Sequence, residues 1–256
     1  MNQDKDEQIL RKRFLDLAGM AYSRGICIFS DFLNLNEQNI FLSLKNELPG
    51  IKYFFNGGFN DAERKILCFC GQDLYTEEDE LPYPITCIKV VPINHKFSDS
   101  LNHRDFLGAI LNLGLDRSKI GDILIDDNQG YVFAHTAISE FVTEQLIKVK
   151  HTMVNCSIID RRDFDYKPKL KEVIGTVSSM RLDSMIAVAF QSSRSSLSGL
   201  IEGGKVSVGG KLILSNSYTL KENDVVSVRG LGKFIYAGTS YQTKKGRYSV
   251  KLMLYI

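Results

Sequence analysis

Apolar and polar positions in the first part of the chain follow the period of helices and then of short strands. Between residues 1 and 25, apolar side chains recur at intervals of three and four residues, which indicates one buried helical face: Leu10, Phe14, Leu17 and Ala21. A second helix is expected over residues 37–48, followed by short strands at 52–55 and 65–70. Residues 1–80 are therefore predicted to form an αα-ββ subdomain.

The pattern changes after residue 80 to an alternation of strands and helices. The expected elements are a strand at 85–91, a helix at 103–113, strands at 122–125 and 131–135, a helix at 136–147 and a strand at 153–159. The order β-α-β-β-α-β is that of the ferredoxin-like fold, which RNA-recognition modules share. Residues 81–165 are therefore predicted to be an RRM-like module.

The last third begins with a segment whose cations and proline suggest a basic linker, residues 166–180. Two short amphipathic helices follow, the first over 181–190 and the second ending at Gly203-Gly204. Strands are expected at 205–208 and 211–214, joined through Gly209-Gly210, and at 225–229, with a further β-hairpin at the end of the chain. The predicted fold class is α+β, with residues 181–256 as the C-terminal domain.

Charge is distributed unevenly between these regions. Residues 1–168 hold 19 Lys/Arg and 25 Asp/Glu, a net charge of −6, whereas residues 169–256 hold 13 Lys/Arg and 5 Asp/Glu, a net charge of +8. A basic surface attracts phosphate and raises encounter rates with nucleic acid. The alternative is an ordinary solvated basic face. Charge alone therefore nominates the C-terminal third without identifying its partner.

Cations in this third stand at helix starts, turns and strand ends, where they can converge on one phosphate-bearing surface. The candidate RNA-binding residues are six cations and two hydroxyl donors: Arg181, Arg194, Lys205, Lys211, Arg229, Lys233, Ser193 and Ser195. The positive N-terminal end of the second helix would favour the same ligand.

A possible secondary RNA face lies in the central module. Tyr131 and Phe133 follow Gly130 on a predicted strand and share one face, which partly matches the motif whose rings stack on RNA bases. No cation precedes Gly130, and the first strand offers no aromatic partner. The competing interpretation is that these two rings pack against another domain.

The residues of the C-terminal third resemble a known domain. The pattern consists of Arg181-Leu182-Asp183, Ser193-Arg194, Leu200-Ile201, Gly204-Lys205-Val206, Gly210-Lys211 and Asp224. It is similar to the S4 RNA-binding domain, also called the α-L motif. One departure is Gly209, where such domains often have Asn; it should alter only the hairpin turn.

Further segments resemble the bacterial YlmH family over nearly the whole chain. They include Gly57-Gly58-Phe59, Ala62-Glu63-Arg64-Lys65, His103–Gly108, Ile120–Ile123 and Thr243–Arg247. The resemblance implies a ribosome-associated RNA-binding protein without enzymatic activity, linked to the large subunit, to rescue of stalled translation and to cell division. Its partners would be rRNA or tRNA, and it would act as a cytoplasmic monomer without a small-molecule substrate.

Two other function classes compete with this hypothesis. One is a protein-interaction adaptor, in which the acidic N-terminal part binds a division or translation factor. The other is an RNA-modifying enzyme, because such enzymes often carry an S4 domain. A pseudouridine synthase needs its catalytic Asp beyond that domain, whereas Asp183 lies inside it. We therefore expect no catalytic residue.

Other chemistry has little support in the sequence. Val206 occupies the Mg²⁺-ligating position of a phosphate-binding loop that Gly199, Gly204 and Lys205 would otherwise suggest. The four histidines show no ligand spacing, so neither a metal nor a cofactor is expected. The five cysteines lack framework spacing and are expected to be reduced, partly buried thiols. No apolar run reaches the roughly 18 residues that a membrane span needs.

Overall fold

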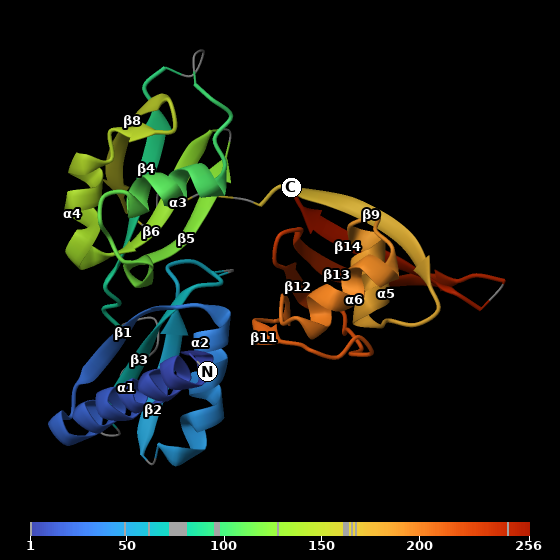
Figure 1. Ribbon diagram of the computed structural model, residues 1–256, viewed down its shortest axis with the longest axis horizontal. Coiled ribbons are helices and arrows are strands. Elements are labelled where there is room, and N and C mark those ends of the chain that lie inside the picture. The colour runs from blue at the N-terminus through green and yellow to red at the C-terminus, as the bar shows by residue number, and fades with distance from the viewer. Residues whose placement is uncertain are drawn as a thin grey trace. The chain divides into compact units, whose positions relative to one another are not determined.

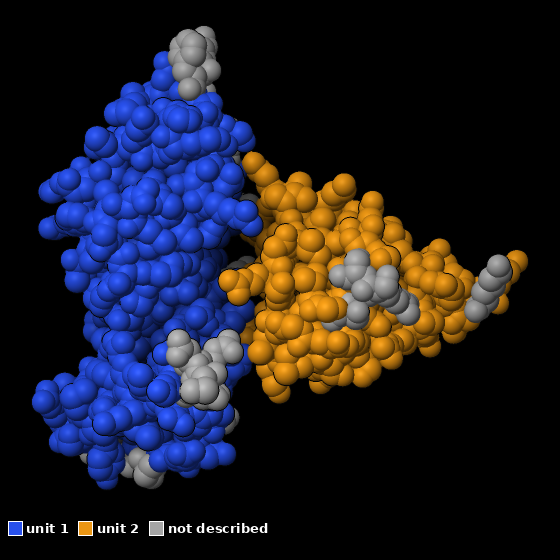
Figure 2. All heavy atoms as spheres, viewed as in Figure 1, with its two compact units in different colours: residues 1–166 blue, residues 167–256 orange. Residues whose placement is uncertain are grey.

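The computed structural model describes residues 2–48, 50–60, 62–71, 81–94, 98–126, 128–160, 164, 166, 168–244 and 246–256. They form two compact units, residues 1–166 and 167–256, coloured blue and orange in Figure 2. The predicted boundary near residue 80 separates two sheets within the first unit. No helix in the described part of the chain combines the length and apolar character that crossing a bilayer requires.

The first sheet of unit 1 has three antiparallel strands in the order β1-β3-β2. Its elements are α1 (Asn2–Arg24), β1 (Cys27–Leu33), α2 (Leu35–Leu44), the 3-10 helix η1 (Lys45–Glu47), β2 (Ile51–Asn56) and β3 (Lys65–Gly71). Both predicted helices and both predicted strands are present. Phe14 of α1, Phe41 of α2 and Phe69 of β3 pack edge to face or tilted at the centre of this core.

Strand β1 was absent from the predicted αα-ββ order, which is therefore incomplete. It pairs with β3 and makes the order αβαββ. A buried serine explains the omission, because Ser30 interrupts the apolar pattern that a buried strand normally shows. Its hydroxyl accepts the Leu67 N–H at 2.9 Å and donates to the Asp31 carbonyl at 2.7 Å, so this polar group is satisfied inside the core.

The second sheet of unit 1 confirms the predicted ferredoxin-like order. Its elements are β4 (Ile85–Pro92), α3 (His103–Leu111), the 3-10 helix η4 (Arg117–Lys119), β5 (Ile120–Asp126), β6 (Gln129–His135), α4 (Thr136–Gln145), β7 (Lys148–Val149) and β8 (Thr152–Ile159). The antiparallel strands lie in the order β5-β6-β4-β8-β7, with β7 as a short additional edge. Helices α3 and α4 lie together on one face of the sheet (Figure 1).

A polar joint connects the two sheets of unit 1. The Asp122 carboxylate accepts hydrogen bonds from the backbone N–H groups of Glu63 at 2.6 Å and Arg64 at 3.2 Å. The Arg64 guanidinium donates to the carbonyl oxygens of Ile120 at 2.9 Å and Phe32 at 3.0 Å. Because charge-assisted hydrogen bonds are stronger than neutral ones, Arg64 and Asp122 fix the first sheet against β5.

Unit 2 is a six-stranded antiparallel sheet in the order β11-β10-β12-β13-β14-β9, with two helices on one face (Figure 1). Its elements are β9 (Leu170–Val177), α5 (Leu182–Ala189), α6 (Arg194–Glu202), β10 (Val206–Val208), β11 (Lys211–Leu212), β12 (Val225–Val228), β13 (Gly232–Gln242) and β14 (Tyr248–Tyr255). Apolar residues of both helices pack against alternate strand residues to form the core. The predicted two helices, hairpin and C-terminal hairpin are present.

The predicted linker 166–180 is wrong over most of its length, because residues 170–177 form β9. This strand pairs with β14 over eight residues, from Leu170 opposite Tyr255 to Val177 opposite Tyr248. An edge strand has only one partner and keeps exposed charges, as Lys171 and Glu172 do. Such a strand resembles a linker in sequence because most of its side chains face solvent.

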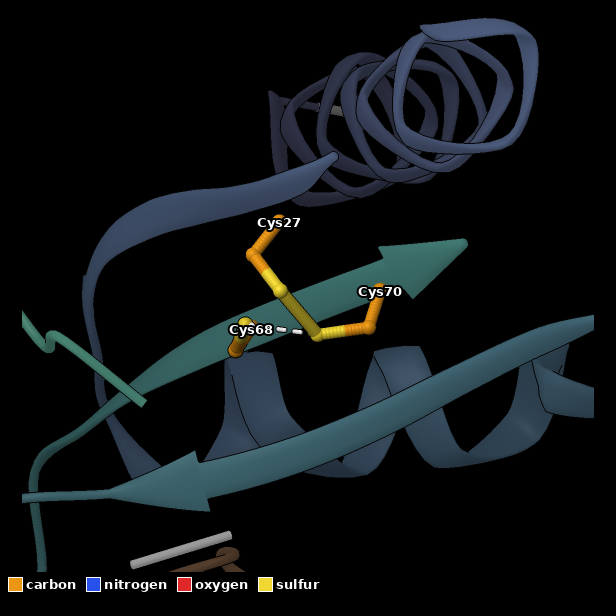
Figure 3. A group of neighbouring side chains, drawn as sticks. All are labelled: Cys27, Cys68 and Cys70. Carbon is orange, nitrogen blue, oxygen red and sulfur yellow. Dashed lines mark hydrogen bonds between the residues drawn. A yellow bond between two sulfur atoms is a disulfide. The ribbon is translucent and has the colours of Figure 1, made fainter. Parts of the chain in front are cut away.

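Three cysteine sulfur atoms lie together between β1 and β3 (Figure 3). Cys27 and Cys70 are opposite each other on the two strands and form a disulfide, with Cα atoms 4.4 Å apart. The buried thiol of Cys68 lies 3.4 Å from the Cys70 sulfur, and burial raises the pKa of Cys68 to about 12. The expectation of five reduced thiols is therefore wrong for Cys27 and Cys70, whose pairing depends on the unpredicted strand β1.

Replacing Cys27 by serine should lower the free energy of unfolding of unit 1 under non-reducing conditions. The disulfide closes a separation of 43 residues, and its loss should cost about 2–4 kcal/mol because the unfolded chain regains conformational freedom. Urea unfolding with and without dithiothreitol measures the effect. Dithiothreitol should lower the stability of the unmodified protein to that of Cys27→Ser. Equal stabilities without the reductant would contradict the prediction.

Candidate RNA-binding surface

The two faces of the unit 2 sheet differ in chemistry because strand side chains alternate. Val206 and Val208 of β10 and Val226 and Val228 of β12 are at most 5% exposed and face α5 and α6. The intervening serines, Ser207 and Ser227, lie opposite each other on the other face. We call this second face, turned away from both helices, the outer face. The polar residues of the outer face alternate along each strand with the valines of the core.

Lys205 and Arg229 continue the pairing of β10 and β12 by one step. The Arg229 backbone N–H donates to the Lys205 carbonyl at 2.8 Å, and both residues are exposed. Each lies two positions from the serine on its own strand, so alternation places both on the outer face. Main-chain pairing therefore brings together two cations that are 24 positions apart in the sequence.

Lys233 extends this group of cations across the sheet. It is opposite Ser227 on β13, and its neighbour Phe234 is buried in the core, so Lys233 also belongs to the outer face. The Lys233 Nζ lies 5.1 Å from the centroid of the Tyr255 ring, within the range of a cation–π contact. An ammonium beside an aromatic ring on an open strand face can contact both a phosphate and a base.

Arg181 is held by a carboxylate at the start of α5. Its guanidinium donates to the two oxygens of Asp183 at 3.2 and 3.0 Å. Partial burial alone would raise the pKa of Asp183, but the bonds from Arg181 and Ser184 hold that pKa below its ordinary value. Asp183 is therefore ionised at neutral pH, which orients Arg181 and offsets part of its charge.

The remaining candidates do not join one continuous group. Lys211 is exposed and pairs with Val208, at the opposite end of β10 from Lys205. Ser193 is exposed just before α6. Arg194 and Ser195 begin α6, and their side chains lie outside the described part of the structure. The structure thus groups Lys205, Arg229 and Lys233, whereas the convergence of all six predicted cations stays a prediction.

Sequence reasoning missed three members of the outer face, namely Ser207, Ser227 and Tyr255. The serine positions could have been found, because each stands alone between valines in a short strand: Val-Ser-Val at 206–208 and at 226–228. Tyr255 could not, because its approach to Lys233 depends on the register of β13 against β14.

The central module does not present Phe133 to RNA, which corrects half of the secondary RNA face. Phe133 is 1% exposed and packs against the rings of Phe59 and Phe164, with centroids 4.8 and 5.2 Å away. Gly58 allows this approach, since a Cβ at that position would lie 2.4 Å from the Phe133 ring. Tyr131 is half-buried, and its ring contacts that of Phe164. The alternative interpretation, in which these rings pack within the protein, holds for Phe133.

The described residues offer one group with metal-ligating chemistry, the three cysteines Cys27, Cys68 and Cys70. Two of these sulfurs are joined in the disulfide, and a bonded sulfur is not the thiolate that binds a metal. The outer face, in contrast, carries cations and hydroxyls suited to phosphate oxygens. These cations can bind a phosphate backbone.

Two domain families match the chain. Residues 80–163 match the family described as "Putative RNA-binding domain in YlmH", and residues 180–226 match the S4 domain. The first match covers the ferredoxin-like module, and the second covers α5, α6, β10, β11 and the first two residues of β12, with Lys205 inside it. The resemblance to the YlmH family and the assignment of an S4 domain are thereby confirmed.

One relative and one solved structure extend the comparison. The chain is 28% identical over 250 residues to ribosome-associated protein quality control protein P2 of Bacillus subtilis (strain 168), covering 96% of this chain and 94% of that protein. The structure of cell division protein ylmH from Streptococcus pneumoniae matches with a TM-score of 0.50 at 18% identity, covering 64% of this chain and 96% of that one. The second similarity shows a shared fold.

Replacing Phe133 by leucine should destabilise unit 1 without weakening RNA binding. Leucine keeps most of the buried volume but loses the aromatic contacts, so the free energy of unfolding should fall by about 1–1.5 kcal/mol. Chemical denaturation measures the first quantity, and filter binding to ribosomal RNA measures the second. A ring that stacks on a base would instead lower RNA affinity about tenfold.

Proposed function

Because the chain carries the RNA-binding domain of the YlmH family and an S4 domain, we propose that it binds structured RNA on the ribosome. The relative in Bacillus subtilis is named as a ribosome-associated quality control protein. The same role is proposed for this chain, with rRNA of the large subunit or tRNA as its partner. Such a role would place the protein in the cytoplasm.

The observation that carries this proposal is the outer face of unit 2, where Lys205, Arg229 and Lys233 surround Ser207 and Ser227. Three cations on this face can contact neighbouring phosphates of the RNA backbone. RNA helices are recognised largely by shape and by their 2′-hydroxyls, which a polar sheet face can contact without reading base sequence. Arg181, which Asp183 orients, supplies a further cation; like Lys205 it lies inside the S4 match, whereas Arg229 and Lys233 lie just beyond it.

We further propose that the protein works by binding alone. Both matched families are binding domains, and the relative's name denotes no reaction. Asp183, the residue that a pseudouridine synthase hypothesis would use, hydrogen-bonds to Arg181 and Ser184 inside the S4 domain. These contacts support a structural role for that carboxylate.

A second candidate function is a protein adaptor, which a groove in unit 1 favours. The groove has a volume of about 550 Å³ and runs beside α1, lined mainly by Leu15, Ala18, Gly19, Tyr22, Leu48 and Ile51. Tyr22 is 61% exposed and nearby Ile26 is 44% exposed. An apolar surface of this kind can accept a side chain of a division or translation factor.

Replacing Lys205 and Arg229 by glutamine should weaken binding to purified large ribosomal subunits and flatten its salt dependence. The slope of log K against log salt is negative, and each lost phosphate contact reduces its magnitude by roughly 0.7–0.9. The slope of the double variant should therefore be about 1.4–1.8 smaller in magnitude. Co-sedimentation over roughly 50–200 mM salt measures both quantities.

The matched control is Lys12→Gln with Arg24→Gln, which removes the same charge from exposed positions of α1. This control should keep the affinity and slope of the unmodified protein. A Lys205 and Arg229 variant that binds as the unmodified protein does would remove the main support for the proposal.

Ribonuclease treatment separates the two candidate functions. If RNA tethers the protein to ribosomes, digestion during affinity purification should release the ribosomal proteins that copurify with it. If the groove beside α1 holds a partner, that partner should survive digestion and be lost when Tyr22 is replaced by lysine. Mass spectrometry of both samples reads out the result.

A further inference from the structure

The final 32 residues of the chain, 225–256, contain six cations and no acidic residue: Arg229, Lys233, Lys244, Lys245, Arg247 and Lys251. The S4 match ends at residue 226, so all six cations lie beyond it. Strands β13 and β14 and their connecting turn carry five of them. This hairpin is therefore a strongly basic element that the S4 assignment does not explain.

The hairpin extends past β12, the strand beside β13, whereas on its other edge β9 pairs with β14 as far as Tyr248. Strand β12 pairs with β13 only as far as Ile235, whereas β13 continues to Gln242. Two irregularities in the β13–β14 register follow Tyr236 and Thr239, and bulges of this kind increase local twist. Figures 1 and 2 show the end of the hairpin projecting from the body of unit 2. Its turn is thus accessible to a partner that approaches from solvent.

The turn itself is held by hydrogen bonds. The Thr243 backbone N–H donates to the Arg247 carbonyl at 2.7 Å, and the Gly246 N–H donates to the Thr243 carbonyl at 2.9 Å. The Arg247 N–H donates to the Thr243 hydroxyl at 3.1 Å, and Gly246 adopts a positive φ of 74°. A turn organised before binding loses little conformational entropy when a ligand binds.

Three described side chains near the turn combine charge with an aromatic ring. Tyr241 is 63% exposed and pairs with Ser249, which alternation places on the outer face beside core residue Val250. Lys244 and Arg247 are exposed, and the Arg247 guanidinium donates to the Thr176 carbonyl at 2.6 Å. Arg247 is therefore oriented by β9. We call Tyr241, Lys244 and Arg247 the hairpin tip.

The same outer face connects the hairpin tip to the group formed by Lys205, Arg229 and Lys233. Along β14 this face has Tyr255 beside Lys233, then Lys251, which lies opposite Gly238 and forms an ion pair with Glu172 of β9, and then the buried Ser249 opposite the exposed Tyr241. A strand rises about 3.4 Å per residue, so the turn lies about 30 Å from Lys233. One extended polyanion can contact both places, whereas a small anion cannot.

We propose that the hairpin tip is a second RNA-contact site, which binds the backbone of the same RNA about 30 Å from Lys233. Lys244 and Arg247 contact phosphates, and Tyr241 stacks on an exposed base. The inference rests on the proposed function and adds to it a contact outside the S4 match. RNA is favoured over an acidic protein because cations and an exposed ring occur together on a face continuous with the group that includes Lys233.

The test uses protein-free 23S ribosomal RNA and the full chain. Lys244→Gln with Arg247→Gln should reduce affinity and reduce the magnitude of the slope of log K against log salt by roughly 1.4–1.8. Because Arg247 also bonds to β9, Lys244→Glu provides a second variant that leaves this bond in place, and it should reduce affinity as well. Thermal unfolding confirms that both variants are folded.

Two variants of Tyr241 test the proposed stacking contact. Tyr241→Ala should lower affinity about tenfold at an unchanged salt slope, because stacking involves no counterion release. Tyr241→Phe keeps the ring and should bind as the unmodified protein does. Equal losses for alanine and phenylalanine, or no loss for alanine, would overturn the stacking contact.

Two further variants in the same assay separate this proposal from the function on which it rests. If Lys205→Gln with Arg229→Gln loses affinity and the tip variants do not, the tip site is wrong and S4 binding stands. If neither set changes affinity, both proposals fall. If Lys12→Gln with Arg24→Gln weakens binding as much as the tip variants, the effect is one of net charge and the tip site is again wrong.

Discussion

The functional surface of unit 2 depends on one constraint, the alternation of side chains along its strands. Helices α5 and α6 cover one face of the sheet, so the valines of β10 and β12 must point toward them. The residues between those valines then face the other way, whatever their chemistry. Ser207, Ser227 and Lys233 lie side by side for this reason. The packing of the core thus sets the spacing of the groups proposed to bind RNA.

Unit 1 uses the corresponding sheet face differently. The ferredoxin-like module has its helices on one face, as RNA-recognition modules do, but rings of the chain itself cover Phe133 on the other. Gly58 and the Arg64–Asp122 joint hold the first sheet in this position. Several motifs of the YlmH resemblance, including Gly57-Gly58-Phe59 and Ile120–Ile123, therefore serve the contact between two sheets.

The two units consequently make different contributions. Unit 2 concentrates cations on an accessible sheet face and on a projecting hairpin, where they can meet phosphate. Unit 1 offers an apolar groove beside α1 and a disulfide between β1 and β3. The two candidate functions therefore use surfaces of different units.

The sequence alone determined the elements whose signals are local. Helical periodicity, the β-α-β-β-α-β order, the S4 pattern and the charge difference were all readable, because each depends on residues close together in the chain. Tertiary structure decided the rest. Strand β1 was hidden by buried Ser30, and β9 by the exposed charges that an edge strand keeps. The Cys27–Cys70 disulfide and the grouping of Lys205, Arg229 and Lys233 depend on strand register. Cys27 and Cys70 are 43 positions apart and Lys205 and Arg229 are 24 apart, so contacts between distant segments decide which residues come to lie opposite each other.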